Sequence, residues 1–560
     1  MSTKPNKKNQ DSNSLQEQIV KLEKQLESFK HSNEHFLKNK LFLHYDIKEP
    51  EKVVVDCETK LPVLVEVDKK KIQKRTESDL THLLIEGDNY HALSVLNYTH
   101  AGKVDVIYID PPYNTGNMDF IYNDHFVDRE DSFRHSKWLS FMAHRLRLAK
   151  NLLAETGVIF ISIDDNEQAH LRLLCDQIFG EENFVANFTW IKKEKASGVP
   201  PKRMILPNKE YVLAFAKNAE SIKFKGQERS LASYKQDEDG RWWRTMPIQA
   251  TGNQKTSFII VDPKTGNKYP GRWAFSEKKI LEMIEQGKIA FPKSGKGLPT
   301  QIVYADEMSN QASPVFEHLG MFDSEVATKS VKSMFGGNFP FNFPKPVELI
   351  EFLVEQGGKK SAVILDFFAG SGTTGHAVLK LNAQDSGTRQ FILCTNNENK
   401  IAEDVTYPRI KKVIDGYGDT AGIPTNLRYF KTDFVEKKGS VSQLKIDLTR
   451  QCAEMLCVKE NVFEAVRLKK TAKNYRFFKN GNKYLGVFFD FFTDPEFTEF
   501  IAELNRLPQE AEKVVYIFVL DGSAGIFADE FAGVANCEVK EIPQKILDIY
   551  KQLAREVARK

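Results

Sequence analysis

Cysteine is scarce in this 560-residue sequence, and long apolar runs are missing. The six cysteines include no Cys-x-x-Cys pair and no cysteine–histidine cluster at zinc-ligand spacing, which argues against structural zinc and agrees with a reducing cytoplasm. No apolar stretch approaches the ~20 residues that cross a bilayer, and no apolar segment follows the lysine-rich start. We therefore expect a cytoplasmic protein, without membrane insertion or secretion.

The sequence also has little net charge and no nucleotide-binding phosphate loop. Its 79 basic and 76 acidic residues leave a net charge of +3, which by itself indicates no polyanionic partner. The G-x-x-x-x-G-K-[ST] pattern does not occur, so an ATP-driven step of the P-loop type would need another protein. By contrast, 41% hydrophobic and 28% charged residues are typical of a globular protein with a large core. The length predicts three to four domains, or two large ones with insertions.

The N-terminal region carries one helical pattern. After a polar tail over 1–14, apolar residues alternate spacings of four and three through about three heptads. They are Leu15, Ile19, Leu22, Leu26, Phe29 and Phe36, with Asn33 as the polar member. The pattern predicts a segment over 1–44 that either forms a dimerising coiled coil or packs on its own domain. The mixed, charged residues 45–75 predict a connecting segment.

Short β-branched runs alternate with helical stretches from residue 80 onward, which predicts βαβ units and a mainly parallel sheet. The alternation stops between 217 and 340, where turn-forming sequences take over, and then resumes, so we expect a sheet split by an inserted domain. A further α/β pattern over 430–560 predicts a separate tail domain. The expected strands are 83–85, 104–109, 158–163, 211–216, 363–365 and 391–394, and the expected helices are 89–96, 136–154, 166–179, 347–356 and about 404–414.

The first loop with candidate reactive groups is Asp110-Pro111-Pro112-Tyr113, directly after the strand expected at 104–109. Ligands of open parallel sheets bind beyond the carboxyl ends of the strands. The prolines stiffen the loop and remove two N–H donors, which leaves a carboxylate, bare carbonyls and an aromatic face. This set suits an exocyclic amine on a flat heterocycle, with Asp110 and the Pro111 carbonyl as acceptors and Tyr113 stacked on the ring. The alternative is an ordinary strand-ending turn.

The second such loop covers 365–375, LDFFAGSGTTG, again between a strand and a helix. Gly370, Gly372 and Gly375 satisfy the dinucleotide pattern G-x-G-x-x-G, with Glu398 placed for ribose hydroxyls, so a nicotinamide oxidoreductase is one candidate. However, Asp366 precedes the glycines, and a carboxylate close to a helix start would repel a pyrophosphate while suiting a sulfonium or amino group. The loop therefore fits S-adenosylmethionine better than NAD.

Together these motifs resemble those of the β-class amino-methyltransferases. In that class a DPPY motif comes first, a target recognition domain follows, and a PKPVELI-like segment, here 344–350, precedes an LDFFAGSGTTG-like loop. The strings LLIEGDNYHAL, DVIYIDPPYNTG, GVIFISIDDNE and NKEYVLAFAKN resemble the modification (Mod) subunits of type III restriction-modification systems, over roughly 80–415. The resemblance implies an α/β, Rossmann-like methyltransferase with circularly permuted motifs, whose parts would be 45–216, a target recognition domain over 217–340, 341–429 and an α/β C-terminal domain over 430–560.

The resemblance also implies individual roles. Asp110, Pro111, Pro112 and Tyr113 match the catalytic tetrad around a flipped base. The cofactor residues it implies are Asp366, Phe368, Gly370, Gly372 and Thr373 in the loop, Glu398 for the ribose, Lys345 beside the methionine pocket and Asp88 near the adenine. For Asp88 a turn with a helix N-cap is an equal alternative. No metal is expected in methyl transfer.

The expected insertion is locally basic. Residues 191–300 contain 22 basic and 11 acidic residues. Aromatic and cationic residues alternate there, as beside phosphates and unstacked bases, namely Trp190, Trp242, Trp243, Trp273, Arg241, Arg244 and Arg272. We expect DNA contacts from Arg241, Trp242, Trp243, Arg244 and Arg272. The alternative is a solvated lysine-rich surface over a tryptophan core.

The sequence thus predicts a DNA adenine-N6 methyltransferase, the modification subunit of a type III system, which uses S-adenosylmethionine and flips its base out of duplex DNA. Expected partners are double-stranded DNA, a second copy of the chain and a restriction (Res) helicase/nuclease subunit. A tetrad that begins with aspartate favours adenine N6 over cytosine N4. The alternatives are a cytosine-N4 enzyme, a solitary methyltransferase without a restriction partner, the oxidoreductase, and a catalytically silent DNA-binding protein.

Overall fold

A computed structural model gives the structure of the chain between residues 50 and 558. The residues in that range that it does not describe are 76–79, 193–204, 206, 229–230, 252–256, 294, 308–311, 316, 320–321, 338–340, 342, 468–471, 490–494 and 521–523. The N-terminal segment with the Leu15–Phe36 pattern lies outside the described residues. The described chain divides into two compact units, one formed by Lys223–Leu319 with Glu355–Gly357 and the other by the rest.

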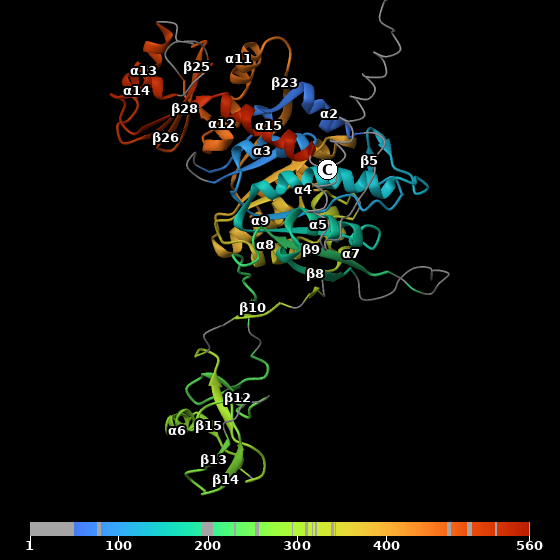
Figure 1. The fold of residues 1–560 in the computed structure, drawn as a ribbon, viewed down its shortest axis with the longest axis vertical. Helices are drawn as coiled ribbons and strands as arrows, with labels where there is room; N and C mark the ends of the chain where they lie inside the picture. Colours follow the sequence, from blue (N-terminus) through green and yellow to red (C-terminus); the bar gives the residue numbers. More distant parts are fainter. Residues whose placement is uncertain are drawn as a thin grey trace, which may run out of the picture. The chain divides into compact units, whose positions relative to one another are not determined.

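The larger unit is built on one mixed, mainly parallel sheet (Figure 1). Its strands run in the order β1-β23-β3-β20-β19-β4-β7-β9-β8, with β2 beside β23. The five pairs from β23 to β7 are parallel, and β1, β9 and β8 are antiparallel additions at the two sides. The bounds are β1 Lys60–Glu66, β2 Ile72–Gln73, β3 Thr81–Glu86, β4 Val104–Ile109, β7 Leu153–Ile163, β8 Phe184–Ile191, β9 Lys209–Ala216, β19 Val363–Asp366, β20 Gln390–Thr395 and β23 Asn426–Glu436. The α/β fold with a mainly parallel sheet is confirmed.

Helices cover this sheet because its central strands are apolar on both faces. Alternate residues of β3, β4 and β7, such as Leu83, Ile107 and Ile159, share one core cluster with Leu93 of α3 and Trp138 of α4. The helices of this part are α2 Lys52–Thr59, α3 Asn89–Thr99, α4 Arg134–Leu152, α5 Gln168–Phe179, α7 Ser324–Met334, α8 Val347–Gly357, α9 Thr373–Asp385 and α10 Tyr407–Asp415. None of the described helices combines the length and the apolar character needed to span a bilayer.

The interpretation of 45–75 as a connecting segment is wrong. Residues 52–59 form α2, and β1 pairs along its whole length with β23, from Lys60 opposite Glu436 to Glu66 opposite Phe430. Leu61, Val63 and Leu64 are buried. The partner strand follows some 370 residues later in the chain, so the apolar run at 61–65 had no neighbouring strand signal to support it.

The described residues of the smaller unit form several short antiparallel pairs and the helix α6. β12 lies between β11 and β16, β15 follows β16, and β13 and β14 form a hairpin. Its core includes Ile248, Ile260, Tyr269 and Trp273. The bounds are β11 Lys235–Gln236, β12 Trp242–Pro247, β13 Ser257–Val261, β14 Lys268–Arg272, α6 Glu277–Glu285, β15 Ile289–Ala290 and β16 Thr300–Tyr304. The insertion expected at 217–340 contains this unit together with α7, which belongs to the larger one.

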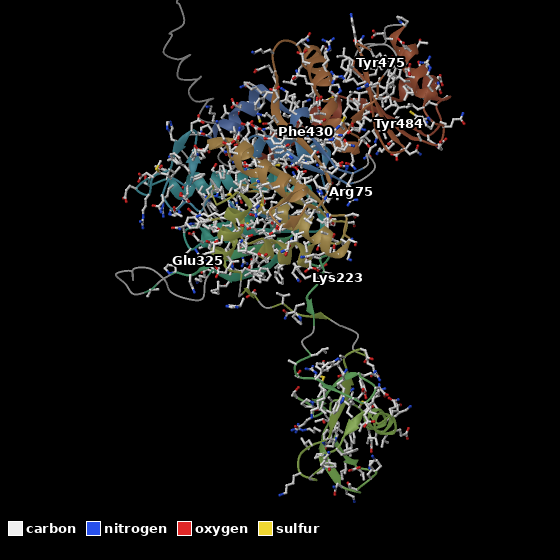
Figure 2. The ribbon with its side chains drawn as sticks, turned by 180° about the vertical axis from the view of Figure 1, so that it is seen from behind. Arg75, Lys223, Glu325, Phe430, Tyr475 and Tyr484 are labelled. Atoms are coloured by element: carbon white, nitrogen blue, oxygen red, sulfur yellow. The ribbon has the colours of Figure 1, made fainter. Side chains whose placement is uncertain are left out.

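The C-terminal region adds a five-stranded sheet that is continuous with the main core. Figure 2 marks Phe430 on β23 and Tyr475 and Tyr484 on the C-terminal strands. β23 runs through the boundary expected at 429/430, and Leu448, Met455 and Tyr516 belong to the same core cluster as the main sheet. The bounds are α11 Val441–Gln451, α12 Ala453–Glu460, β24 Glu464–Ala465, β25 Tyr475–Asn480, β26 Lys483–Phe488, α13 Glu496–Arg506, β27 Glu512–Phe518, α14 Ala528–Phe531, β28 Cys537–Ile542 and α15 Gln544–Ala558.

Candidate active site

Two neighbouring parallel strands bring the two motif loops together. β4 and β19 pair with Leu365 opposite Ile107, so Asp110 and Asp366 leave the sheet at the same edge. The charge of Asp110 is close enough to raise the pKa of Asp366, although burial of Asp366 is the larger cause. The loops lie more than 250 residues apart in the chain, and the sheet alone makes them neighbours.

The Asp110–Tyr113 loop is held in place by side chains from other elements. The Tyr113 hydroxyl lies 2.9 Å from Asp110 Oδ1 and 3.0 Å from Glu210 Oε2. Trp138 of α4, fully buried, donates from Nε1 to the Pro112 carbonyl at 2.7 Å. Burial and the two carboxylates hold the pKa of Tyr113 well above its usual value, so the ring stays a neutral phenol.

Lys345 binds the carboxylate at the centre of this loop. Its Nζ donates to both oxygens of Asp110, at 2.9 and 2.8 Å, and lies 3.4 Å from Glu210 Oε2. Burial opposes the ammonium charge, but the carboxylates of Asp110 and Glu210 outweigh it and raise the pKa of Lys345. The lysine expected beside the methionine pocket therefore contacts the Asp110–Tyr113 loop directly.

Glu210 is a site residue that the motif analysis missed. It lies at the start of β9, is largely buried, and forms a 3.0 Å ion pair with Lys192. Burial raises its pKa, but Lys345 and Lys192 overcome this and leave the pKa below its usual value. The only sequence feature that pointed to Glu210 was its place as an acidic residue at the N-terminal end of the apolar strand in NKEYVLAFAKN.

Asp366 stabilises the loop between β19 and α9 through hydrogen bonds within it. Its Oδ1 accepts from the backbone N–H of Phe368 at 3.0 Å, and its Oδ2 accepts from the Thr374 hydroxyl at 2.5 Å. Asp366 is 3% exposed, and burial raises its pKa to about 7 despite these two hydrogen bonds. The carboxylate therefore fixes both ends of the turn around the glycines.

The glycines serve turn geometry and close packing. Gly370 and Gly372 have φ of 46° and 78°, and Gly372 is the N-cap of α9. A Cβ on Gly375 would lie 2.6 Å from the Ile410 side chain, so glycine there lets α9 approach α10. The Thr373 hydroxyl is buried and accepts from the Arg409 guanidinium at 2.9 Å. This hydrogen bond joins the start of α9 to α10.

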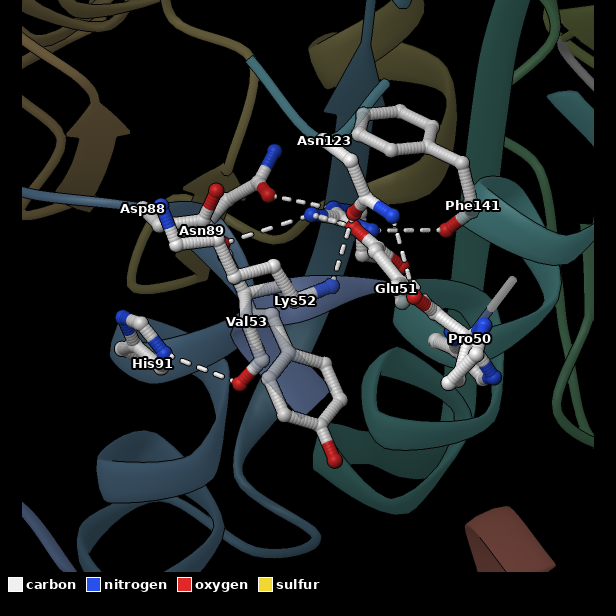
Figure 3. A network of polar contacts seen from close by, with 12 residues as sticks. Pro50, Glu51, Lys52, Val53, Asp88, Asn89, His91, Asn123 and Phe141 are labelled. Atoms are coloured by element: carbon white, nitrogen blue, oxygen red, sulfur yellow. Dashed lines mark hydrogen bonds and ion pairs between the residues drawn. The ribbon is translucent and has the colours of Figure 1, made fainter. Parts of the chain in front are cut away.

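A buried arginine links Glu51, at the N-terminal end of the described chain, to the loop that follows β19. Figure 3 shows Glu51, Asp88 and Asn89, three members of this network. Arg145 of α4 is fully buried and forms ion pairs with Glu51 at 2.8 Å and Asp88 at 3.3 Å. Its Nε donates to Asn89 Oδ1 at 2.5 Å, and the Asn89 amide donates to the Phe367 carbonyl at 2.9 Å. Residues from three separate segments, around 51, 88–89 and 145, thus support the loop that follows β19.

Asp88 performs the N-cap role that was left open. Its carboxylate accepts from the backbone N–H of Tyr90 at 2.7 Å, which caps α3, and its side chain is about one third exposed. Glu398 follows β20 at the same edge of the sheet and is exposed. Its Oε2 accepts from the Asn396 amide at 3.4 Å.

The basic and aromatic residues of the insertion divide into two groups. Trp273 is a core residue of the smaller unit, and Trp190 is buried on β8, where its Nε1 donates to the Phe322 carbonyl. For these two indoles the structure bears out the alternative of a tryptophan core, because both are 1% exposed or less. By contrast, Trp242 is 39% exposed, and Arg272 is exposed at the end of β14.

Charge in the smaller unit is more balanced than the local count suggested. Between 223 and 319 the sequence has 15 basic and 11 acidic residues. Arg241 forms ion pairs with Asp306 and Glu307, at 2.9 and 3.1 Å, and Arg244 lies over the Tyr234 ring, 5.1 Å from its centroid. The basic excess over 191–300 therefore lies partly in the segment 191–222, ahead of this unit.

Three histidine and glutamate side chains also converge near the tetrad, namely His135, Glu167 and His170. Glu167 is fully buried, and both histidines are partly exposed. They are neither part of the motif set nor expected from the sequence.

The sequence of the chain is similar to those of known proteins. A family described as DNA methylase, of the N6/N4 type, matches residues 104–406, which is just over half of the chain and includes both motif loops, Glu210 and Lys345. The chain belongs to this DNA methylase family.

Individual relatives match over about 60% of the chain. The type III restriction-modification enzyme StyLTI Mod subunit of Salmonella typhimurium is 36% identical over 59% of this chain and 55% of its own length. The EcoPI Mod subunit of Escherichia phage P1 is 33% identical over 60% of each chain. The type II methyltransferase M.KpnI of Klebsiella pneumoniae is 32% identical over 60% of this chain and 88% of its own. This DNA methylase thus spans 55–60% of the length of the two Mod subunits.

Proposed function

We propose that the chain is an S-adenosylmethionine-dependent DNA adenine-N6 methyltransferase and the modification subunit of a type III system. The observation that carries the proposal is the pairing of β4 with β19, which puts the Asp110–Tyr113 loop beside the Asp366–Gly375 loop. The identity with the StyLTI and EcoPI Mod subunits supports the type III assignment. A restriction subunit would then be its partner.

The tetrad has acceptor capacity left for one amine. A carboxylate offers about four acceptor positions, and one contact from Tyr113 and two from Lys345 occupy three of these positions on Asp110. The fourth can accept one N–H of an exocyclic amine, and the carbonyl of Pro111 can accept the second. The aromatic face of Tyr113 then supports the flat ring, and the carboxylate stabilises positive charge that develops on the nitrogen.

The loop after β19 has the features of a cofactor site for a cationic ligand. Gly370 and Gly372 have positive φ and carry no side chain, so no side chain of their own covers the backbone there at the start of α9. The ring of Phe341 is 3.5 Å from where a Gly370 Cβ would stand. Phe368, Gly370 and Gly372 would hold S-adenosylmethionine, and Glu398, exposed after β20, would bind the ribose. When bound there, S-adenosylmethionine supplies an electrophilic methyl group.

The proposal is tested with tritiated S-adenosylmethionine and duplex DNA. We expect acid-stable label in DNA and, after digestion to nucleosides, label in N6-methyladenosine. Label in N4-methylcytidine would select the cytosine alternative, and unlabelled DNA would contradict the proposal. Single-molecule sequencing of DNA from cells that express the chain gives the recognised sequence and shows whether one strand is modified.

Cofactor affinity should depend on the protonation of Asp366. With a pKa of about 7, its carboxyl is mostly ionised at about pH 8 and mostly protonated at about pH 6. Protonation converts one acceptor oxygen into a donor and loosens the turn held through Phe368 and Thr374. We expect calorimetry to show S-adenosylmethionine affinity falling up to about tenfold from about pH 8 to about pH 6. The Asp366→Asn variant should bind weakly at both values, and a pH-dependent variant would contradict this assignment.

Arg272 should contact DNA through a phosphate. Its side chain is exposed on the smaller unit at the end of β14. For Arg272→Ala we expect weaker duplex binding, a salt slope smaller by about one, and unchanged S-adenosylmethionine affinity. Lys279→Ala on α6 makes the same change of charge and serves as the control. Equal salt slopes for both variants and the unaltered chain would remove Arg272 from the interface.

A further inference from the structure

The three-residue cluster beside the catalytic loop is a hydrogen-bonded carboxylate. Glu167 precedes α5 and is 0% exposed. His135 Nδ1 lies 2.6 Å from its Oε1, and His170 Nδ1 lies 2.7 Å from its Oε2. Both distances are those of direct charge-assisted hydrogen bonds and are too short for two ligands of one metal ion, which are held further apart by its coordination geometry.

The proton arrangement on His135 favours the same interpretation. Arg134 donates from Nε to His135 Nε2 at 3.1 Å, so that ring nitrogen carries a lone pair. A neutral His135 then has its proton on Nδ1, where it donates to Glu167. A metal on Nδ1 would move the proton to Nε2, where this N–H would face the Nε–H of Arg134, another donor. The surroundings of the cluster therefore fit a buried carboxylate with histidine donors.

A third donor connects this carboxylate to the tetrad. Asn114 follows Tyr113 directly, is fully buried and has a φ of 56°, in the left-handed region. Its amide nitrogen lies 2.5 Å from Glu167 Oε1 and 3.3 Å from the Arg134 carbonyl. Both partners are acceptors, which fixes the orientation of the amide. A non-glycine residue in this conformation persists when its surroundings hold it, and Glu167 is the charged group that does so.

We propose that Glu167 is a positioning residue for methyl transfer, which acts through Asn114 to set the Tyr113 ring and the Asp110 carboxylate. The inference rests on the proposed function and adds a residue from outside the motif set. The loop is then fixed on three sides, by Glu210 at the Tyr113 hydroxyl, by Trp138 at the Pro112 carbonyl and by Glu167 at Asn114. Loss of the third anchor misplaces the ring without removing any group that touches the base.

The test compares Glu167→Gln and Asn114→Gly with the unaltered chain. The first variant keeps the shape of the side chain but turns an oxygen acceptor into an N–H donor that faces other donors. The second removes the amide while suiting a positive φ, so it separates the link to Glu167 from backbone strain. We expect kcat to fall about 10- to 100-fold in both, because small displacements of reacting groups have effects of this size. The KM for S-adenosylmethionine and the duplex Kd should stay within about twofold.

A second readout follows the base itself. With 2-aminopurine at the target position, both variants should still flip the base but show altered fluorescence, because its stacking on Tyr113 changes. The double variant should be no slower than the worse single one, since both changes break one link. Glu181→Gln, an exposed carboxylate beyond the other end of α5, is the matched control and should keep full kcat.

The outcomes separate this inference from the function on which it rests. No transfer by the unaltered chain contradicts the proposed function, and with it the role of Glu167. An active unaltered chain with both variants within twofold of its kcat overturns the inference alone. Stoichiometric zinc in the purified protein, lost in His135→Ala, would also overturn it, because the cluster would then be a metal site.

Discussion

The Asp110→Asn variant should lose methyl transfer by at least about 10²–10³-fold, the range for removal of one preorganised charge-stabilising group from an active site. Asparagine has the same shape but only one acceptor oxygen and no charge. Lys345 donates to both carboxylate oxygens in the structure, so the variant also weakens its hold on the loop. The developing positive charge on the substrate nitrogen then has no anionic neighbour on this loop.

Binding measurements show whether this loss belongs to the chemical step. Calorimetry with S-adenosylmethionine and a duplex shift assay should give affinities close to those of the unaltered chain, while tritium transfer in a single turnover falls. Asp176→Asn, on the surface of α5, makes the same chemical change away from the loop and should transfer normally. Turnover retained by Asp110→Asn would remove Asp110 from the catalytic set.

Arg145→Met should be the most destabilising of the substitutions considered. Arg145 is fully buried and has two carboxylate partners, so its removal leaves the buried Glu51 without the guanidinium and with His144 as its remaining side-chain partner among the residues that the structure describes. Breaking a buried ion pair on one side destabilises by about 3–5 kcal/mol. The loss of the Asn89 contact should also loosen the Phe367 carbonyl and weaken cofactor binding.

Urea unfolding followed by circular dichroism measures this effect. The double variant Arg145→Met with Glu51→Gln should recover part of the stability, because no buried charge is left unpaired on that side. Lys52→Met breaks a neighbouring but exposed pair with Asp124 and should change the midpoint little. A midpoint for Arg145→Met equal to that of Lys52→Met would show that the buried network does not support the fold.

The elements that flank the motifs could be predicted because their signals are local. The strand expected at 104–109 has those bounds in the structure, and the helix expected at 347–356 ends one residue later. Apolar runs of parallel strands are continuous, and their boundaries coincide with the turns that carry the chemistry. For the same reason Asp110 and Asp366 could be placed at strand ends before the sheet order was known.

Contacts between distant segments could not be predicted from the sequence. Lys345 and Asp110 are 235 residues apart, and Glu210 joins them from a third segment, so no spacing in the sequence connects the three. Arg145 lies within a long amphipathic helix, where a cation normally faces solvent, and only the fold shows that it is buried. For Trp190 and Trp273 the choice between core and surface stayed open, because composition cannot tell a core indole from an exposed one.

The strand order has a consequence for synthesis on the ribosome. β19 and β20 lie between β3 and β4, yet they are made after both of these strands and after the whole smaller unit. A nascent chain that ends before residue 363 lacks β20 and β19, which join β3 to β4, and also β23, which joins β1 to β3. The longest-range strand pairs therefore form last. Termination before residue 363 therefore yields no partial enzyme, since β19, one of the strands that join β3 to β4, also carries Asp366.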